Sequence, residues 1–341
     1  MAGNERCIRA LSGRTVVPLL AITDRGAALK RCKARKSRDN RVNPSLRSIA
    51  DLLRIHFFFA WPLLFCSGLV LAFVQYDTFS WNTTAKAVLI AFFGFEGGFV
   101  INDFVDRRYD TRDVDGRLTR YWRPFGTRPL VGGALSARQV IAIGVLLIAA
   151  AAALTLTLPR PHNIYVLVIG VYSYTAEILY QLGKRSQHLP FAQLIGRTDF
   201  ALFPAAGYLC AGFPDTTALL YVLFFYPFAL AHLGVNDLAD EENDRAREMQ
   251  TVTVLYGRRG SAWWIGGFTL LHFALGLLFA TRLGIVGQAG IVLGNLLLLA
   301  GNYWIFRSPD PASAIRVLPI FHATMICYTI AIIADAAIRI A

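Results

Sequence analysis

The sequence predicts an all-α polytopic membrane protein with nine transmembrane helices. Apolar residues make up 55% of the 341 residues and charged residues only 16%, with a mean hydropathy of +0.47. A soluble domain carries about 25% charged residues. The apolar runs reach the roughly 20 residues that a helix needs to cross a bilayer. They must be helical, because lipid offers the backbone polar groups no partner.

Nine apolar runs are expected to cross the membrane, one after another along the chain. Several contain glycine or proline, which membrane helices tolerate. We place the spans at residues 55–75, 85–102, 139–158, 162–182, 190–212, 217–236, 261–281, 284–306 and 313–338. Matching polar motifs follow the second and the sixth span, so the pattern predicts two related four-helix halves plus a final helix.

The basic residues predict the orientation of the chain. Of the 34 Lys and Arg residues, all but Lys86, Arg160, Arg282 and Arg339 lie in the N-terminal segment or on the side of the loops that follow even-numbered spans. Basic loops stay in the cytoplasm. We therefore expect an integral protein of the cell membrane whose N-terminus and site loops are cytoplasmic and whose C-terminus lies outside. Topology explains the net charge of +12, so no nucleic-acid partner is expected.

The beginning of the chain differs from the rest. Residues 1–48 contain the basic run RCKARKSRDNR and no apolar span. We expect a disordered cytoplasmic tail that contacts anionic lipid, with an organellar transit peptide as the alternative for an arginine-rich segment. Residues 49–341 are expected to form the nine-helix domain.

Two stretches share one acidic pattern at the ends of the second and sixth spans. NDFVDRRYD covers residues 102–110, and NDLADEEND covers residues 236–244. Spacings of three and four residues place side chains on one face of a helix. Each motif is therefore expected to extend its helix and to present its aspartates together. These aspartates are Asp103, Asp106, Asp110, Asp237, Asp240 and Asp244.

Clustered carboxylates need a compensating cation, because they repel one another and the negative end of the helix dipole adds to the repulsion. Mg²⁺ is the expected ion, since a few carboxylates and substrate phosphates typically bind it. Basic side chains that suit a diphosphate gather in the neighbouring loops. They are Arg107, Arg108, Arg112, Arg117, Arg120, Arg123, Arg128, Lys184, Arg185, Arg245 and Arg247. The sequence thus predicts a polyanion held between metal and basic residues.

An apolar wall is expected beside the first motif. Residues 92–99, FFGFEGGF, combine aromatic rings with glycines that leave room, and residues 57–61, FFFAW, add further rings. A diphosphate at the membrane edge beside such helices implies an amphiphile with a long apolar tail. If its C–O bond ionises, aromatic faces can stabilise the allylic cation by cation–π attraction.

These motifs resemble those of the UbiA superfamily of intramembrane prenyltransferases, from about Arg54 to the C-terminus. NDFVDRRYD is similar to the first Asp-rich motif of that family and DLADEEND to the second. RPLVGGALS at 128–136 resembles its Arg-Pro-x-x-x-Gly segment, and TVTVLYGRRG at 251–260 its Thr-x-x-x-x-x-Gly stretch. LYQLGKRSQHLP at 179–190 resembles the Tyr-x-x-x-Lys-Arg segment, especially of 4-hydroxybenzoate polyprenyltransferase-like members.

The resemblance implies a UbiA-type fold and Mg²⁺-dependent prenyl transfer in the lipid bilayer. It implies that the aspartates of both motifs bind Mg²⁺ and act in catalysis, and that the donor is an isoprenyl diphosphate. A motif carboxylate is the expected base that removes the ring proton of an aromatic acceptor. The expected substrate-binding residues are Arg54, Asn102, Arg128, Tyr180, Lys184, Arg185 and Asn236.

The possible functions differ in the acceptor that receives the isoprenyl group. An aromatic acid or quinone precursor ranks first because of LYQLGKRSQHLP. The alternatives are an archaeal-type geranylgeranylglyceryl phosphate geranylgeranyltransferase and a UbiA-type terpene cyclase. The loop at 111–127 is longer than the family pattern, and we expect it to cap the site and to influence the acceptor. A cation-coupled transporter is the non-enzyme alternative, although transporter charges usually lie near the bilayer midplane.

Overall fold

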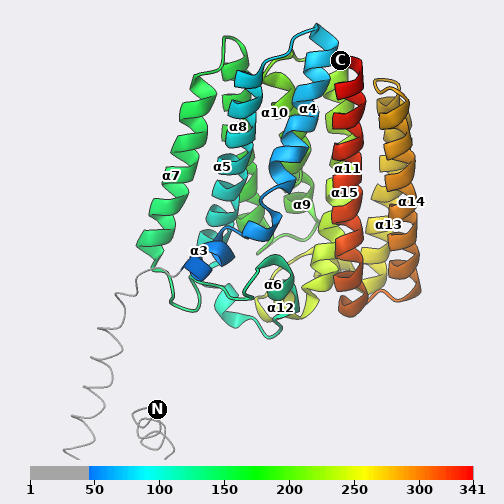
Figure 1. Cartoon of the computed structure of the whole chain (residues 1–341). Helices are drawn as coiled ribbons and strands as arrows, with labels where there is room; N and C mark the ends of the chain where they lie inside the picture. Colours follow the sequence, from blue (N-terminus) through cyan, green and yellow to red (C-terminus); the bar gives the residue numbers. More distant parts are fainter. Residues whose placement is uncertain (1–45, 341) are drawn as a thin grey trace, which may run out of the picture. The chain divides into compact units, whose positions relative to one another are not determined.

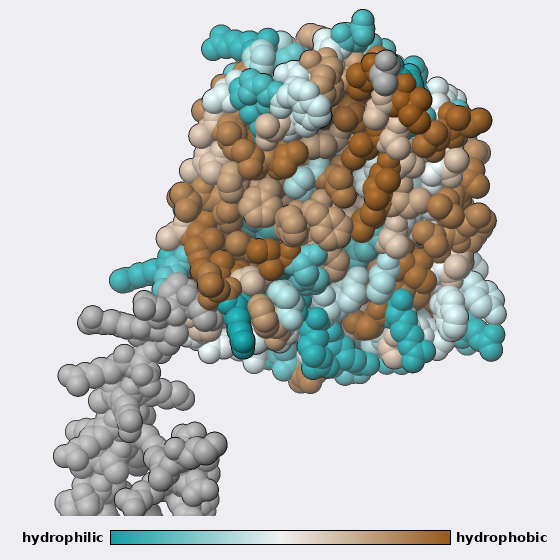
Figure 2. Space-filling model, in the orientation of Figure 1, coloured by the Kyte–Doolittle hydropathy of each residue, from teal (hydrophilic) through white to brown (hydrophobic). Residues whose placement is uncertain are grey.

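A computed structural model describes residues 46–340, in which every regular element is a helix. The predicted tail at 1–48 lies almost wholly outside these residues. Among the described helices, eight are long and apolar enough to cross a membrane. An apolar band covers the visible face between polar ends (Figure 2). The predicted all-α membrane fold is confirmed.

The spanning helices stand side by side (Figure 1), and the contacts between neighbouring helices form a ring in chain order. They are α4 Ala60–Tyr76, α5 Trp81–Asp106, α7 Ala137–Leu156, α8 His162–Gly183, α11 Thr216–Ala239, α13 Val252–Ala280, α14 Ile285–Arg307 and α15 Pro311–Ile340. The shorter elements are α3 Leu46–Leu52, η2 Ile55–Phe57, η3 Asp110–Arg112, α6 Arg117–Trp122, α9 Phe191–Gly196, α10 Thr198–Leu209 and α12 Glu241–Ala246. The ring closes because α15 packs against α4, while α10 joins α8 to α11.

The span predicted at 190–212 is not one continuous helix. Helix α9 ends at Gly196 and α10 begins at Thr198, with Arg197 between them at φ −76° and ψ −2°. The Arg197 guanidinium pairs with Glu177 of α8 at 3.3 Å. Interrupted helices occur in membranes where they line a cavity. The expected nine uninterrupted spans are therefore replaced, within residues 46–340, by eight spanning helices and this divided one.

Two glycines allow α4 and α10 to touch. A Cβ atom on Gly68 would lie 1.9 Å from the carbonyl oxygen of Pro204, and one on Gly207 would lie 1.8 Å from that of Phe65. Small residues at helix crossings bring membrane helices to close contact. This crossing fixes one wall of the apolar cavity described below.

Polar caps set where several spanning helices begin. The Ser80 hydroxyl accepts the amide of Thr83 at 3.2 Å, and the Asp215 carboxylate accepts the amide of Ala218 at 2.9 Å. Such caps contribute about 1 kcal/mol each. The capped starts of α5 and α11 lie at the polar end opposite α6 and α12. The acidic motifs, at the other ends of α5 and α11, therefore lie at the same end as α6 and α12 (Figure 1).

Candidate functional site

The first acidic motif turns out of its helix before it is complete. Helix α5 ends at Asp106, the amide of Tyr109 donates to the Asp106 carbonyl at 2.8 Å, and Asp110 opens the 3₁₀ turn η3. The expected continuous helix through residue 110 is therefore wrong. The turn nevertheless keeps Asp103, Asp106 and Asp110 buried, at 5%, 4% and 6% exposure.

The second motif is interrupted in a similar way. Helix α11 ends at Ala239, Asp240 has φ −100° and ψ 11°, and α12 begins at Glu241. The Asp237 carboxylate accepts the amide of Val252 at 3.0 Å, and Asp244 accepts the Thr251 hydroxyl at 2.9 Å. Residues of the segment after the motif thus hold Asp237 and Asp244 in place. The three aspartates are not aligned along one continuous helix.

Basic side chains neutralise the first motif from several elements. Arg123 binds both carboxylate oxygens of Asp103, at 2.8 and 2.7 Å, and Arg54 approaches the same group at 3.3 Å. Asp106 pairs with Lys184 at 2.7 Å and with Arg185 at 3.0 Å. The loop after α8 therefore reaches the first motif, as expected for residues that would share a bound anion.

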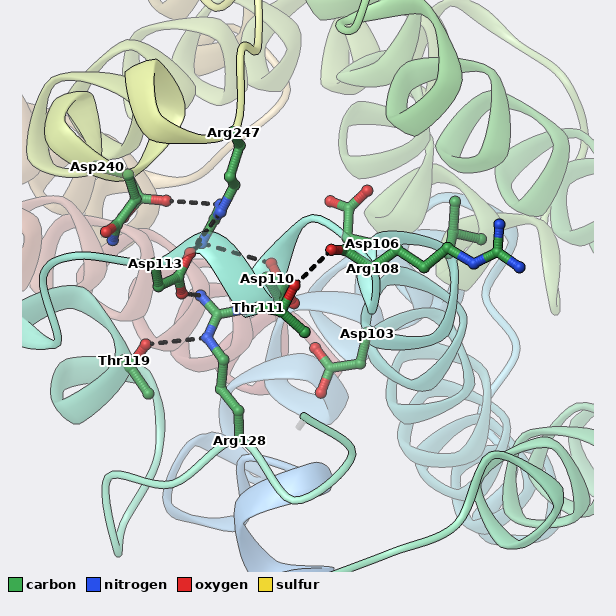
Figure 3. Close-up of polar contacts among 12 residues, drawn as sticks. Asp103, Asp106, Arg108, Asp110, Thr111, Asp113, Thr119, Arg128, Asp240 and Arg247 are labelled. Atoms are coloured by element: carbon green, nitrogen blue, oxygen red, sulfur yellow. Dashed lines mark hydrogen bonds and ion pairs between the residues drawn. The ribbon is translucent and has the colours of Figure 1, made fainter. Parts of the chain in front are cut away.

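Arg247 joins the two acidic motifs (Figure 3). Its guanidinium lies 3.1 Å from Asp240 of the second motif and 3.4 Å from Asp110 of the first. It also donates through Nε to Asp113 at 2.5 Å. Arg128 lies 2.5 Å from Asp110 and 3.0 Å from Asp113 on the other side. The motifs are thus bridged through Arg128 and Arg247, which the sequence named among its basic residues, and through Asp113, which it did not assign to the site.

One cavity of about 150 Å³ collects most of the predicted site. Every predicted site residue lines it except Asp103 and Arg185. The lining residues are Arg54, Asn102, Asp106, Asp110, Arg128, Tyr180, Lys184, Asn236, Asp237, Asp240 and Asp244, joined by Leu118, Thr119, Trp122, Arg123, Leu233, Arg247 and Thr251. Side chains 134 residues apart in the sequence therefore face one space.

The carboxylates of this cavity are incompletely compensated. Burial raises the pKa of Asp110, and the guanidinium of Arg128 offsets only part of the effect. Burial and the charge of Asp240 raise the pKa of Asp244 well above its ordinary value. Both shifts mean that the negative forms are costly here, so an additional cation would stabilise them.

The residues of the cavity fit a divalent metal by their chemistry. The motifs supply carboxylate oxygens, which Mg²⁺ prefers. Within residues 46–340, no three acidic, cysteine or histidine side chains converge closely enough to hold an ion as they stand. Arg128 and Arg247 lie between the carboxylates instead. A metal would therefore take oxygens that these arginines now contact.

A larger apolar cavity of about 380 Å³ adjoins the charged one, because both share Arg54, Asn102, Trp122, Tyr180, Leu233 and Asn236 as lining residues. Trp61 stacks on Phe95 with ring centroids 3.9 Å apart, and Phe99 packs at 5.0 Å from Phe95. These three expected aromatic residues line the cavity. The exposed Phe58 and Phe59 do not, and neither do Phe57, Phe92 and Phe93.

A polar cluster interrupts the apolar lining. Glu177 accepts the Asn102 amide at 2.9 Å and pairs with Arg197 at 3.3 Å. The guanidinium of Arg197 and the ammonium of Lys184 each lie 5.1 Å from the ring centre of Tyr180. Tyr180 thus contacts one cation of each cavity, Lys184 of the charged cavity and the half-buried Arg197 of the apolar one. Arg197 lies within the span predicted at 190–212, and the sequence assigned it no role in the site.

The long loop at 111–127 lies over the charged cavity and is held at both ends. The side chain of Asn243 accepts the amides of Val114 and Asp115 at 2.9 and 2.8 Å. The carboxylate of Asp51, in α3, accepts the amides of Phe125 and Thr127 at 2.7 and 2.9 Å. The loop therefore caps the site as expected, and no periodic pattern could have assigned Asp51 to it.

Replacing Asp51 with alanine is expected to loosen this loop. Without the fully buried carboxylate, the amides of Phe125 and Thr127 would lose their partner, and each lost hydrogen bond costs about 0.5–1.5 kcal/mol. Limited trypsin digestion in detergent should cut faster after Arg120 and Arg123. Asp77→Asn, which removes a carboxylate at an exposed position on another loop, is the control. Equal cleavage of both variants would contradict the role of Asp51.

Comparisons with known proteins agree with this arrangement. The model of the UbiA prenyltransferase family matches residues 59–325. A digeranylgeranylglyceryl phosphate synthase of Thermococcus kodakarensis is 27% identical over 76% of this chain and 87% of its own. A 4-hydroxybenzoate octaprenyltransferase of Psychrobacter arcticus is 31% identical over 47% of this chain and 48% of its own.

Solved structures share the fold. A UbiA homologue from Aeropyrum pernix K1 matches with a TM-score of 0.67 and 18% identity, over 82% of this chain and 98% of its own. A UbiA homologue from Archaeoglobus fulgidus, bound to DMAPP and Mg²⁺, matches with a TM-score of 0.60 and 17% identity, over 84% of this chain and 99% of its own.

Proposed function

Since this chain belongs to the UbiA prenyltransferase family, we propose that it transfers an isoprenyl group from a polyprenyl diphosphate to an aromatic acid or quinone precursor. The family assignment makes it a membrane prenyltransferase, which sets the transporter alternative aside. One observation carries the proposal: the charged cavity and the apolar cavity share lining residues. Together they suit a donor with a diphosphate head and an apolar tail.

The diphosphate is proposed to lie in the charged cavity. Mg²⁺ would be held by carboxylates from Asp103, Asp106, Asp110, Asp237, Asp240 and Asp244, and would supply charge that stabilises the leaving diphosphate. Lys184, Arg185 and Arg128 would donate to the diphosphate oxygens, because they already contact carboxylates of the first motif. Asn102 and Asn236 line the junction of the two cavities and would orient the donor.

The reacting carbon of the donor is proposed to lie near that junction. Trp61, Phe95 and Phe99 present aromatic faces to the apolar cavity, and these can stabilise positive charge that develops at C1. The loop at 111–127 would exclude water from that carbon, which protects the cation from hydrolysis. Arg54, whose pKa burial lowers to about 10, lines both cavities and would bind a polar group of the acceptor.

Two acceptor classes have support. The motif LYQLGKRSQHLP favours an aromatic acceptor. The Thermococcus relative, named digeranylgeranylglyceryl phosphate synthase, matches over a larger share of both chains, which favours a glycerol phosphate ether. A terpene cyclase would need no acceptor.

One assay separates these reactions. Labelled geranylgeranyl diphosphate and Mg²⁺ are incubated with the purified protein and 4-hydroxybenzoate, geranylgeranylglyceryl phosphate or no acceptor. A prenylated aromatic product supports the first class, a prenylated ether lipid the second, and a cyclised hydrocarbon the third. EDTA should abolish each. Turnover that persists undiminished in EDTA would refute the metal-dependent reaction.

We further propose that the site faces the cytoplasm. The described chain begins at α3, at the site end, and finishes with α15 at the opposite end (Figure 1). The basic loops lie with the site, as expected for the cytoplasmic side. A cysteine introduced at Asp77 should then react with impermeant reagents from outside intact cells, and protection there would reverse the assignment.

A further inference from the structure

Three polar side chains from separate helices form a hydrogen-bonded chain that the proposed binding of the donor does not use. His232 of α11 and His322 of α15 lie with their Nε2 atoms 3.2 Å apart. Nδ1 of His322 lies 2.5 Å from the hydroxyl of Tyr121, in α6 of the capping loop. The chain therefore runs from the helix bundle to the loop.

The two ends of this chain lie in different surroundings. His232 lines the apolar cavity, together with Arg54 and Asn236. His322 is 6% exposed, whereas Tyr121 is only partly buried. One end thus reaches the space proposed for the reacting groups, and the other approaches the polar end of the molecule.

Packing alone does not account for the polar atoms. Trp122 and Phe57 contact the ring of His322 at 5.0 and 5.1 Å between centroids, and a phenylalanine ring would fill the same space. Ionisable side chains within membrane segments are costly and usually functional. Both nitrogens of each imidazole can exchange protons, so linked histidines can conduct one.

We propose that His232, His322 and Tyr121 form a path that carries the acceptor's proton out of the apolar cavity. The inference rests on the proposed function, because an aromatic C–H or alcohol O–H acceptor must lose one proton when it is prenylated. The sequence suggested a motif carboxylate as the base that removes this proton. The histidines would provide a second path for it.

The atoms balance as follows. The C1–O bond of the donor breaks, its electron pair leaves with the diphosphate, and the acceptor bonds to C1. The acceptor's proton passes to Nδ1 of His232, whose Nε2 proton moves to Nε2 of His322. The Nδ1 proton of His322 moves to the Tyr121 oxygen, and the Tyr121 hydroxyl proton passes to water. One proton enters the chain and one leaves it.

Neighbouring groups hold the two ends of this hydrogen-bonded chain in place. The Asn236 amide donates to the main-chain oxygen of His232 at 3.2 Å and lies 3.4 Å from each of its ring nitrogens, so it packs against the imidazole that lines the apolar cavity. The indole of Trp122 donates to the Asn236 oxygen at 3.3 Å and fixes the orientation of this amide. His56 lies 3.0 Å from the main-chain carbonyl of Tyr121. That contact steadies α6 but cannot relay a proton.

The test compares Tyr121→Phe and His322→Ala with Tyr303→Phe, an exposed control on α14. Single-turnover transfer of labelled geranylgeranyl diphosphate to 4-hydroxybenzoate and to geranylgeranylglyceryl phosphate is measured at saturating Mg²⁺. We expect transfer to slow at least tenfold in Tyr121→Phe and about a hundredfold in His322→Ala, because general base catalysis contributes about 10²–10⁴. Donor affinity should not change. Tyr303→Phe should match the wild type.

Added imidazole should restore His322→Ala, whereas toluene, which fills the same space without accepting a proton, should not. Wild-type rates in Tyr121→Phe, or equal rescue by toluene, would overturn the path. Tyr121→Phe keeps the ring in place and so remains informative if His322→Ala misfolds. If the wild-type protein prenylated neither acceptor, the proposed function itself would be refuted. There would then be no acceptor proton for the path to carry.

Discussion

Replacing Asp106 with asparagine is expected to lower prenyl transfer by a factor of about 10²–10³, the loss typical of one electrostatic catalytic group. Asp106 is buried, lines the charged cavity and contacts both Lys184 and Arg185. The amide keeps the shape of the side chain and removes the charge that would bind Mg²⁺. Single-turnover rates with saturating donor and Mg²⁺ measure the effect.

The fold should survive this change. Lys184 loses its closest carboxylate but stays in the field of Asp237 and Asp244, so its charge is still compensated. Asp77→Asn makes the same chemical change at an exposed position with φ 50°, a conformation that asparagine tolerates well. Transfer in Asp106→Asn at the rate of Asp77→Asn, with both proteins eluting as the wild type does, would contradict a role for the first motif in catalysis.

The sequence predicted the parts of the site that follow a regular spacing. Apolar runs of spanning length located the helices, and the repeated motif brought Asp106 and Asp240 to one cavity. Spacing worked because both motifs begin inside α5 and α11. The expected helical continuation failed beyond Asp106 and Ala239, where the helices end and backbone carbonyls lack intrahelical partners, although Asp110 and Asp244 still line the cavity.

The contacts made by the loops could not be predicted from the sequence. Asp51 and Asn243 hold the capping loop through its backbone amides, and amide positions carry no residue pattern. Arg247 was one of many loop arginines that orientation alone could explain, yet it bridges the motifs. Likewise Phe92 and Phe95 looked equivalent in the sequence, and only packing shows that Phe95 lines the cavity.

Replacing Arg123 with methionine is expected to have the largest effect on stability. Arg123 is 3% exposed, binds both oxygens of Asp103 and donates to the Asp51 carbonyl at 2.7 Å. Removing one partner of a buried ion pair costs about 3–5 kcal/mol, because the other charge stays buried. Arg54 still approaches Asp103 at 3.3 Å, so we expect the lower end of that range for the free energy of unfolding.

A double-mutant comparison separates this ion pair from the loop contact. In Arg123→Met combined with Asp103→Asn the buried charge is gone, so part of the lost stability should return, measured by unfolding in detergent. Arg123→Lys keeps the charge but cannot bind both oxygens at once, and should fall between the wild type and methionine. Recovered stability without recovered transfer would show that Asp103 is needed in the reaction as well. If the double variant were no more stable than Arg123→Met, the main role of Arg123 would be its bond to the Asp51 carbonyl, which joins the capping loop to α3.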